Sequence, residues 1–280
     1  MKTIQIETII SSVKELCIRA NYDLPEDVYV KLKEGIVKEE SPVGQDILRD
    51  ICYNADIAKE EQVPICQDTG TTVVFVKLGQ EVHIEGGLLS EAINEGVRQG
   101  YKEGYLRKSI VENPLYRVNT KDNTPAVIHY EIVAGDKLEI LIAPKGGGSE
   151  NMSRVYMLTP SQGIEGVKRA VLEAVRLAGP NACLPVVVGI GLGGNFEKST
   201  YLAKKALTRD IGSVNPDERM ARLEGELLEA INKLGIGPQG LGGSVTALAV
   251  HIEDYPCHIA SMPLAINMGC HVNRHKSITL

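Results

Sequence analysis

The order of the elements that the sequence predicts constrains this fold more than any single motif. Residues 1 to about 62 have the apolar spacing of three amphipathic helices, of which the second begins at Pro25 and the third at Pro42. After residue 70, β-rich and helical stretches follow one another without a regular βαβ alternation. The sequence therefore predicts an α+β fold, with an N-terminal helical segment followed by mixed β-sheets flanked by helices.

Periodicity and turn residues assign the later elements. Two apolar runs surround Gly135-Asp136 within residues 127–145, which predicts a β-hairpin. We expect the other strands at 71–79, 186–190, 245–253 and 258–267, and the helices at 87–105, 160–178, 196–209 and 216–234. No linker, repeat or low-complexity segment interrupts this order, and 280 residues are enough for one large domain or two small ones.

Composition and charge exclude several classes of protein. The net charge is −6 and no block of Lys or Arg occurs, so we expect no nucleic-acid partner. No stretch approaches the ~20 apolar residues that span a bilayer, and the first residues lack the apolar core of a signal peptide. We therefore expect a cytoplasmic protein without a membrane partner.

Two stretches match the G-x-G-x-x-G pattern of dinucleotide sites, at 189–194 and 235–240. The first is followed by two predicted helices where a dinucleotide fold would have a second parallel strand after one helix. The second contains Pro238, which removes an amide that could bind phosphate. These features favour tight loops where backbones approach closely, and an NAD-dependent oxidoreductase is the alternative from another class.

The cysteines fall into two groups, and no C-x-x-C pair occurs among them. Cys17 and Cys52 lie among helical residues with apolar neighbours, which is typical of core packing. The other four are candidate ligands: Cys66, Cys183 and Cys270 lie in glycine- or proline-bearing loops, and Cys257 lies beside His258. A zinc site at Cys257 and His258 is awkward, because neighbours in a strand point to opposite faces. Three such thiolates could hold an iron–sulfur cluster with one open iron, or zinc, or only pack, and spacing alone leaves these alternatives open.

A third glycine-rich stretch follows the predicted hairpin. Three consecutive glycines, Gly146, Gly147 and Gly148, lie between Lys145 and Ser149. Three glycines in a row cost conformational entropy, which is compensated where a ligand lies against bare backbone amides. We expect this loop to contact a ligand.

Four long motifs together carry a family resemblance. They are I-C-Q-D-T-G-T, A-P-K-G-G-G-S-E-N, G-I-G-L-G-G-N-F-E-K-S and H-I-A-S-M-P-L-A-I-N-M-G-C-H-x-x-R. The chain resembles class I, iron–sulfur-dependent fumarate hydratases from about residue 10 to residue 275. More narrowly, it resembles the α subunit of their two-subunit form, which L-tartrate dehydratase shares. That subunit is equivalent to the N-terminal domain of single-chain members, which implies that residues 1–280 form a single iron–sulfur hydro-lyase catalytic domain.

The resemblance implies a [4Fe–4S] cluster bound by Cys66, Cys183 and Cys270, with Cys257 not a ligand. An iron without a protein ligand would act as a Lewis acid on the hydroxyl of a 2-hydroxy acid. The implied reaction is reversible removal of water from a four-carbon dicarboxylate, malate to fumarate as in the tricarboxylic acid cycle. L-Tartrate is the alternative substrate.

The resemblance also implies the roles of other residues. Asp68 matches the acid/base carboxylate, and Gln67 beside it matches a substrate-binding residue. Arg107 matches the arginine that pairs a substrate carboxylate, although Arg98 or Arg117 could take its place. Gly146, Gly147 and Gly148 match the loop that closes on the substrate, and His258 matches a histidine that hydrogen-bonds the carboxylate end.

The resemblance further implies a partner. Single-chain members have a second domain that supplies further contacts to the substrate, and nothing in these 280 residues resembles it. We therefore expect a separate β subunit that completes the active site, in an α2β2 or similar heteromer.

Overall fold

The computed structural model describes residues 2–280, and the chain divides into two compact units. The first unit contains the residues up to Pro25 together with Ala55–Gly147 and Arg274–Leu280. The second contains Glu26–Asn54 and Gly148–Asn273. Each unit has its own hydrophobic core, so each is described by itself.

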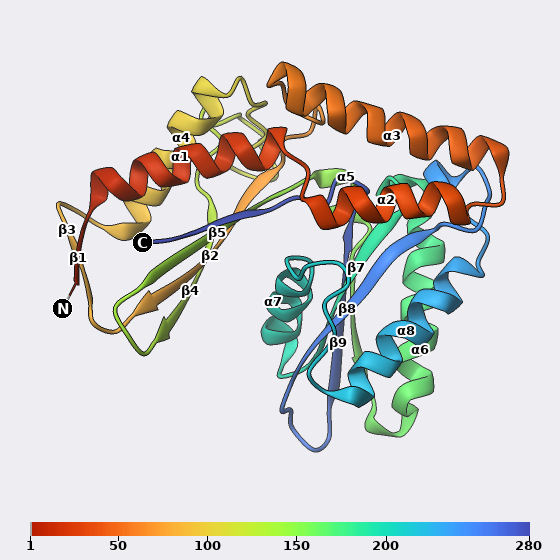
Figure 1. Cartoon of the computed structure of the whole chain (residues 1–280). Helices are drawn as coiled ribbons and strands as arrows, with labels where there is room; N and C mark the ends of the chain where they lie inside the picture. The colour runs from red at the N-terminus through yellow and green to blue at the C-terminus, as the bar shows by residue number, and fades with distance from the viewer. Residues whose placement is uncertain (1) are drawn as a thin grey trace. The chain divides into compact units, whose positions relative to one another are not determined.

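The first unit is a four-stranded sheet covered by two helices (Figure 1). Its strands, in spatial order, are β10 (Lys276–Thr279), β5 (Leu138–Lys145), β2 (Thr71–Gly79) and β4 (Val127–Val133). The helices are α1 (Ile6–Tyr22) and α4 (Leu89–Glu103), which pack against each other. Alternate residues of β5, such as Ile140 and Ile142, are buried toward the helices, as the two-residue period of a strand requires.

The two helices approach closely at glycines. A Cβ on Gly96 would lie 2.6 Å from Cβ of Val13, and a Cβ on Gly100 would lie 2.8 Å from Cβ of Cys17. Cys17 is fully buried at this contact, which confirms its predicted role in core packing. A short parallel pair, β1 (Lys2–Gln5) and β3 (Val82–Glu85), completes the unit.

The predicted hairpin at 127–145 is wrong in its pairing. Both strands exist as β4 and β5, but they lie on either side of β2 and bond to it instead of to each other. The link between them crosses the end of β2 at Gly79, where a Cβ would lie 2.5 Å from the carbonyl oxygen of Gly135. Gly79 therefore leaves room for the crossing.

The second unit has a sheet with helices on both faces (Figure 1). Its strands, in spatial order, are β6 (Arg154–Leu158), β9 (Met262–Gly269), β7 (Val186–Gly193) and β8 (Ala247–Tyr255). α7 (Phe196–Ala206) covers one face, and α6 (Gly163–Ala178) and α8 (Glu218–Asn232) cover the other. The main core lies beneath α6 and α8, where Val171, Leu227 and Ile190 are fully buried.

The crossing seen in the first unit recurs in the second. β8 and β9 follow each other in the chain, yet they flank β7 and do not pair with each other. Gly193 ends β7 where a Cβ would lie 2.0 Å from the carbonyl oxygen of Tyr255. The sequence reading found no repeat, but both units share this arrangement around a glycine-ended central strand.

The first G-x-G-x-x-G stretch mostly lies inside β7 and is not a loop, so that part of the sequence reading is wrong. A Cβ on Gly191 would lie 1.9 Å from the carbonyl oxygen of Ser199, and one on Gly189 would lie 2.2 Å from that of Ala203. The expected close approach of backbones is confirmed, since these glycines let α7 rest directly on the strand. The backbone of β7 is hydrogen-bonded to β8 and β9 in the sheet. This stretch therefore offers no phosphate-binding loop, which the oxidoreductase alternative would need.

The α2–α3 connection is fixed by a buried carboxylate. α2 (Glu26–Lys38) and α3 (Pro42–Glu61) begin at or beside the prolines that predicted them. Between them, Glu39 accepts hydrogen bonds from the backbone N–H groups of Ser41, Ser244 and Val245. Burial raises the pKa of Glu39, but these donors outweigh it and hold the pKa below its ordinary value.

The α+β class is confirmed, with the N-terminal helices and the mixed sheets as predicted. The sequence reading missed β1, β3, β6 and β10, which are four or five residues long. It also missed α5 (Gly147–Asn151), a short helix that begins within the glycine-rich stretch. Within residues 2–280, no helix has the length and apolar character needed to cross a membrane.

Candidate active site

The segment Cys66–Gly70 connects α3 to β2 in the first unit. Its residues change from exposed to buried along the chain: Gln67 is exposed, Cys66 and Asp68 are partly exposed, and Thr69 and Gly70 are buried. The Cys66 Sγ accepts a hydrogen bond from the Asp68 backbone N–H at 3.4 Å. The reactive side chains thus lie at the surface of this unit, above a buried base.

The Asp68 carboxylate is held by two backbone amides. Oδ1 accepts the N–H of Gly70 at 3.0 Å, and Oδ2 accepts the N–H of Gly147 at 2.8 Å. A carboxylate has about four acceptor positions, so each oxygen can still accept a further proton or hydrogen bond. Asp68 is therefore oriented by the protein and keeps acceptor capacity for a ligand.

Two glycines of the glycine-rich stretch lie against the Asp68 carboxylate. A Cβ on Gly146 would lie 3.2 Å from Oδ2 of Asp68, and one on Gly147 would lie 3.8 Å from it. Neither glycine has a positive φ. A Cβ on Gly146 would therefore crowd the Asp68 carboxylate, whereas one on Gly147 would make an ordinary van der Waals contact with it. Gly148, the third glycine, belongs to the second unit and is exposed.

Three consecutive carbonyls of the segment point to buried side chains of the first unit. The Arg274 Nη2 donates to the Asp68 carbonyl at 2.6 Å. The Tyr101 hydroxyl donates to the carbonyls of Thr69 at 2.6 Å and Gly70 at 3.2 Å. The Asn123 Nδ2 donates to the Gly70 carbonyl at 3.1 Å. The sequence reading missed all three side chains; the only available signal was the arginine at the end of M-G-C-H-x-x-R.

The arginine candidates differ in what already holds them. Arg98 bonds Asp122 at 3.0 Å and also pairs with Glu95, so two carboxylates already engage its guanidinium. Arg107 is exposed, and its backbone carbonyl accepts the Thr69 hydroxyl at 2.8 Å. Arg117 is exposed at a position with φ 53°. The direct bond to Thr69 ties Arg107 to the Cys66–Gly70 segment.

In the second unit, Cys183 and Cys270 lie at the same end of the sheet. Cys183 comes just before β7 and Cys270 directly after β9, and these strands pair with Val187 opposite Gly269. The backbone N–H of His271 donates to the Cys183 carbonyl at 3.1 Å. Cys183 has a left-handed backbone (φ 56°, ψ 71°), which is uncommon for a side chain with Cβ and clusters at functional sites.

His258 and Cys257 lie at the other end of that sheet. Both are exposed on the link from β8 to β9 that crosses the end of β7. The eight residues of β7 separate this link from Cys183 and span roughly 25 Å. Within this unit, His258 is therefore far from Cys183 and Cys270, although the resemblance implies that all three belong to one site.

The thiols fit a metal cluster by exposure and chemistry. Among the described residues no cysteine forms a disulfide, and Cys17 and Cys52 are buried, whereas Cys66, Cys183 and Cys270 are partly exposed. A backbone N–H donated to Sγ, as at Cys66, suits a thiolate that binds metal. Within either unit taken alone, the described residues bring no three His, Cys, Asp or Glu side chains close enough to hold a metal ion. Cys66 belongs to the first unit, and the other two belong to the second.

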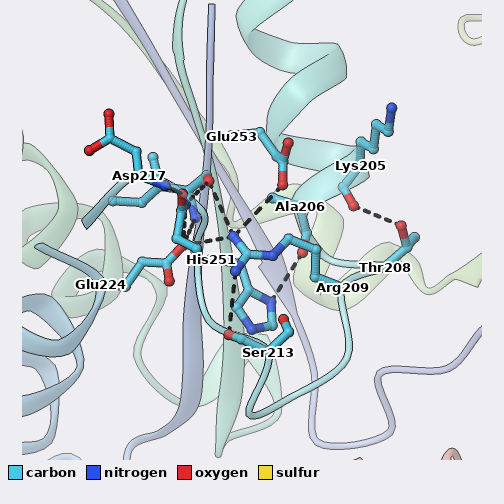
Figure 2. Close-up of polar contacts among 11 residues, drawn as sticks. Lys205, Ala206, Thr208, Arg209, Ser213, Asp217, Glu224, His251 and Glu253 are labelled. Atoms are coloured by element: carbon cyan, nitrogen blue, oxygen red, sulfur yellow. Dashed lines mark hydrogen bonds and ion pairs between the residues drawn. The ribbon is translucent and has the colours of Figure 1, made fainter. Parts of the chain in front are cut away.

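The second unit contains a different buried polar network, shown in Figure 2. Arg209 donates to Glu224 Oε1 at 2.7 Å and to the Ile252 carbonyl at 3.2 Å. Asn215 donates to the same two oxygens, at 3.0 and 2.9 Å, and Glu224 Oε1 also accepts the Ile252 N–H at 2.7 Å. These contacts cover the outer edge of β8, the terminal strand of its sheet, which would otherwise be open to pairing.

Two titratable groups border this network. Burial, followed by the Arg209 charge, lowers the pKa of His251, whose Nδ1 lies 3.2 Å from the Ala206 carbonyl. Burial raises the pKa of Glu253, and Arg209 acts against that rise. Because its partners are scaffold groups of β8, α8 and the preceding loop, we assign the network to stability.

Comparisons with known proteins agree with the motifs. The family model described as Fumarate hydratase (Fumerase) matches residues 10–279. A putative L(+)-tartrate dehydratase subunit alpha from Methanocaldococcus jannaschii is 46% identical over 268 residues, covering 94% of this chain and 94% of that protein. The L(+)-tartrate dehydratase subunit alpha of Escherichia coli K12 is 37% identical over 262 residues, covering 91% and 85% respectively. The expected resemblance is confirmed, and the chain belongs to the fumarate hydratase (Fumerase) family of hydro-lyases.

Proposed function

We propose that this chain is the α subunit of an iron–sulfur hydro-lyase that removes water from a four-carbon 2-hydroxy dicarboxylate. The observation that carries the proposal is the Asp68 carboxylate, which two amides hold next to Cys66 while it keeps acceptor capacity. Similarity over almost the whole chain to α subunits of dehydratases supports it.

Cys66, Cys183 and Cys270 would hold a [4Fe–4S] cluster. When bound, the cluster supplies a Lewis-acidic iron that binds the substrate hydroxyl and weakens its bond to carbon. The partial exposure of these three thiols, none of which forms a disulfide, and the left-handed turn at Cys183 support this ligand set. Cys257, at the far end of the sheet, remains outside it.

Asp68 would move the proton. Its carboxylate Oδ2 can accept a proton from the carbon next to the one that loses the hydroxyl, while the Gly147 N–H continues to bond it. The same amide limits rotation of the carboxylate, which preserves its orientation toward the substrate. In the hydration direction, the protonated Asp68 would return that proton.

Gln67 and Arg107 would bind the substrate. Gln67 is exposed beside Asp68, and its amide offers both a donor and an acceptor. Arg107 presents a guanidinium fork that suits a carboxylate, from a loop bonded to Thr69. The exposed amide of Gly148 is a further donor, whereas the Gly147 amide is used by Asp68. His258 stays a predicted substrate contact. Its position at the opposite end of the sheet from Cys183 and Cys270 does not support that role.

A separate β subunit would complete the active site, in an α2β2 or similar cytoplasmic heteromer. The names of the relatives, which describe them as alpha subunits, support a partner chain. A dicarboxylate has two negative groups, and donors missing from one of them would each cost roughly 3 kcal/mol of transition-state stabilisation. We therefore expect little activity from this chain alone.

Malate to fumarate is the first candidate reaction, because the family model is named for fumarate hydratase. L-Tartrate is the second candidate, because the relatives at 46% and 37% identity are named for it. Both reactions remove the elements of water from a four-carbon 2-hydroxy dicarboxylate.

The test is water elimination by the complex of this chain with its β subunit, loaded anaerobically with iron and sulfide. Fumarate from L-malate and oxaloacetate from L-tartrate are measured separately, with the Asp68→Asn complex as control. Turnover of at least one substrate, lost in the control, is expected. A fully loaded complex that converts neither substrate would overturn the proposal.

A further inference from the structure

The base of the Cys66–Gly70 segment has an unusual set of hydrogen bonds. Three successive carbonyls, those of Asp68, Thr69 and Gly70, each accept a bond from a buried side chain. The donors are Arg274, Tyr101 and Asn123, which are 4%, 0% and 0% exposed. Loops normally satisfy their carbonyls with water, so this segment is anchored from inside.

Anchoring the carbonyls fixes the opposite side of each peptide plane, because a peptide unit is planar. The Asp68 residue is bound at both of its backbone groups: its N–H donates to Cys66 Sγ, and its carbonyl accepts from Arg274. The Gly70 N–H, which binds Asp68 Oδ1, belongs to the same planar peptide unit as the anchored Thr69 carbonyl. The carboxylate orientation is therefore set through the backbone.

The choice of donors also bears on their role. Burial raises the pKa of Tyr101, so its hydroxyl is protonated and donates. Burying a guanidinium is costly, and a neutral amide could bond one carbonyl at lower cost. Arg274 follows Cys270 by four residues, so one short segment contains both a candidate metal ligand and the anchor of Asp68.

We propose that Arg274 is a positioning residue for Asp68, acting through the Asp68 carbonyl while Tyr101 and Asn123 fix the next two carbonyls. This inference rests on the proposed acid/base role of Asp68. It assigns no contact between Arg274 and the substrate. A residue that only stabilised the C-terminal segment would change folding and leave the rate of the chemical step unchanged.

The variants are Arg274→Gln, which removes the charge and the fork, and Tyr101→Phe, which removes only the hydroxyl and keeps the packing. Arg209→Gln is the control, because it removes a partly buried, hydrogen-bonded guanidinium from the second unit. Each variant is studied as the full chain in the complex loaded with iron and sulfide. Iron content, kcat and KM are measured, and amide hydrogen exchange is followed at Gly70 and Gly147.

For Arg274→Gln we expect kcat to fall about 100-fold, the effect of misplacing a catalytic group by about 1 Å, with KM within about threefold. Exchange at the Gly70 and Gly147 amides should accelerate about tenfold, which is the effect of losing one buried hydrogen bond. Tyr101→Phe should change both readouts in the same direction by a smaller factor. Arg209→Gln should leave both near wild type in the folded fraction.

Normal kcat in folded, iron-loaded Arg274→Gln would overturn the proposal, as would a lower kcat with unchanged exchange at both amides. If Arg274→Gln does not fold, Tyr101→Phe decides, and wild-type kcat and exchange in that variant would overturn it. Failure of the proposed function is distinguishable: the wild-type complex would then be inactive, while the exchange measurement would still report whether Arg274 positions Asp68.

Discussion

Two arginines, the buried Arg274 of the first unit and the partly buried Arg209 of the second, are used in different ways. Arg209 bonds the Glu224 carboxylate and the carbonyls of Ile252 and Ser213, all of which are scaffold groups around β8 (Figure 2). Arg274 donates to the backbone carbonyl of Asp68, the residue whose carboxylate lies at the candidate site. The same side chain thus closes a sheet edge in one unit and orients a reactive group in the other. Loss of the first should reduce stability, and loss of the second should reduce the rate of reaction.

The largest expected effect is on the carboxylate that Arg274 orients. Asp68→Asn keeps the shape of the side chain but removes the acceptor that takes the proton, so we expect kcat to fall by about 10²- to 10⁴-fold. Steady-state kinetics of the loaded complex measure it. Glu253→Gln, a carboxylate beside Arg209, is the control and should retain wild-type kcat. Equal losses of kcat in Asp68→Asn and Glu253→Gln would show that the two regions do not differ in their effect on the reaction.

The next effect is on the partner of Arg209. Glu224→Gln removes the buried charge that faces the partly buried Arg209 guanidinium, and we expect the free energy of unfolding to fall by about 3 kcal/mol. Denaturant titration of the full chain measures the loss. The kcat of the folded complex should stay within twofold of wild type. A stable variant with impaired turnover would place this network in the active site and contradict our assignment.

A smaller loss of stability tests the glycines of β7. Gly191→Ala places a methyl group against the Ser199 carbonyl and should destabilise the fold by about 2 kcal/mol, because α7 must move away. Gly225→Ala on α8 is the matched control, since nothing lies within 4 Å of its Cβ position. That change should stabilise the chain by about 0.5–1 kcal/mol. Thermal unfolding of both variants would show whether close packing explains the motif.

The smallest effect is a pH dependence in the second unit. The native pKa of His251 lies below its ordinary 6.5, so the unfolded chain binds a proton that the folded chain excludes as the pH falls through this range. Stability should therefore be complete above pH 6.5 and decline below it, by at most about 1.4 kcal/mol per pH unit. His251→Asn should flatten this slope, as measured by denaturant unfolding from neutral to mildly acidic pH. An unchanged slope would show that His251 does not contribute.

The sequence predicted the fold class and the segment around Cys66, but it could not predict what holds that segment. Apolar periodicity located β4 and β5, but it cannot reveal that β2 lies between them. The apolar pattern of a strand does not depend on which strands it pairs with. The Asp68–Gly147 bond joins residues 79 positions apart, and its only signal was a run of glycines read as a ligand loop.

The glycine motifs and His258 show the same limit. The spacing of 189–194 matched a phosphate loop, but three-dimensional packing of α7 uses those glycines. His258 stands near Cys270 in the sequence, and a strand that runs the length of the sheet separates them in the fold. Arg274 was visible in the motif, but only the structure connects it to Asp68.

The proposed cluster ligands are tested most directly by measuring the iron bound to four single variants. Cys66→Ser, Cys183→Ser, Cys270→Ser and Cys257→Ser are each purified as full chains, treated anaerobically with iron and sulfide, desalted and analysed for iron and labile sulfide. We expect the first three variants to lose the cluster, because each removes a ligand, and we expect Cys257→Ser to keep the wild-type content of iron and sulfide. Normal iron in any of the first three, or loss of iron in Cys257→Ser, would contradict this ligand assignment.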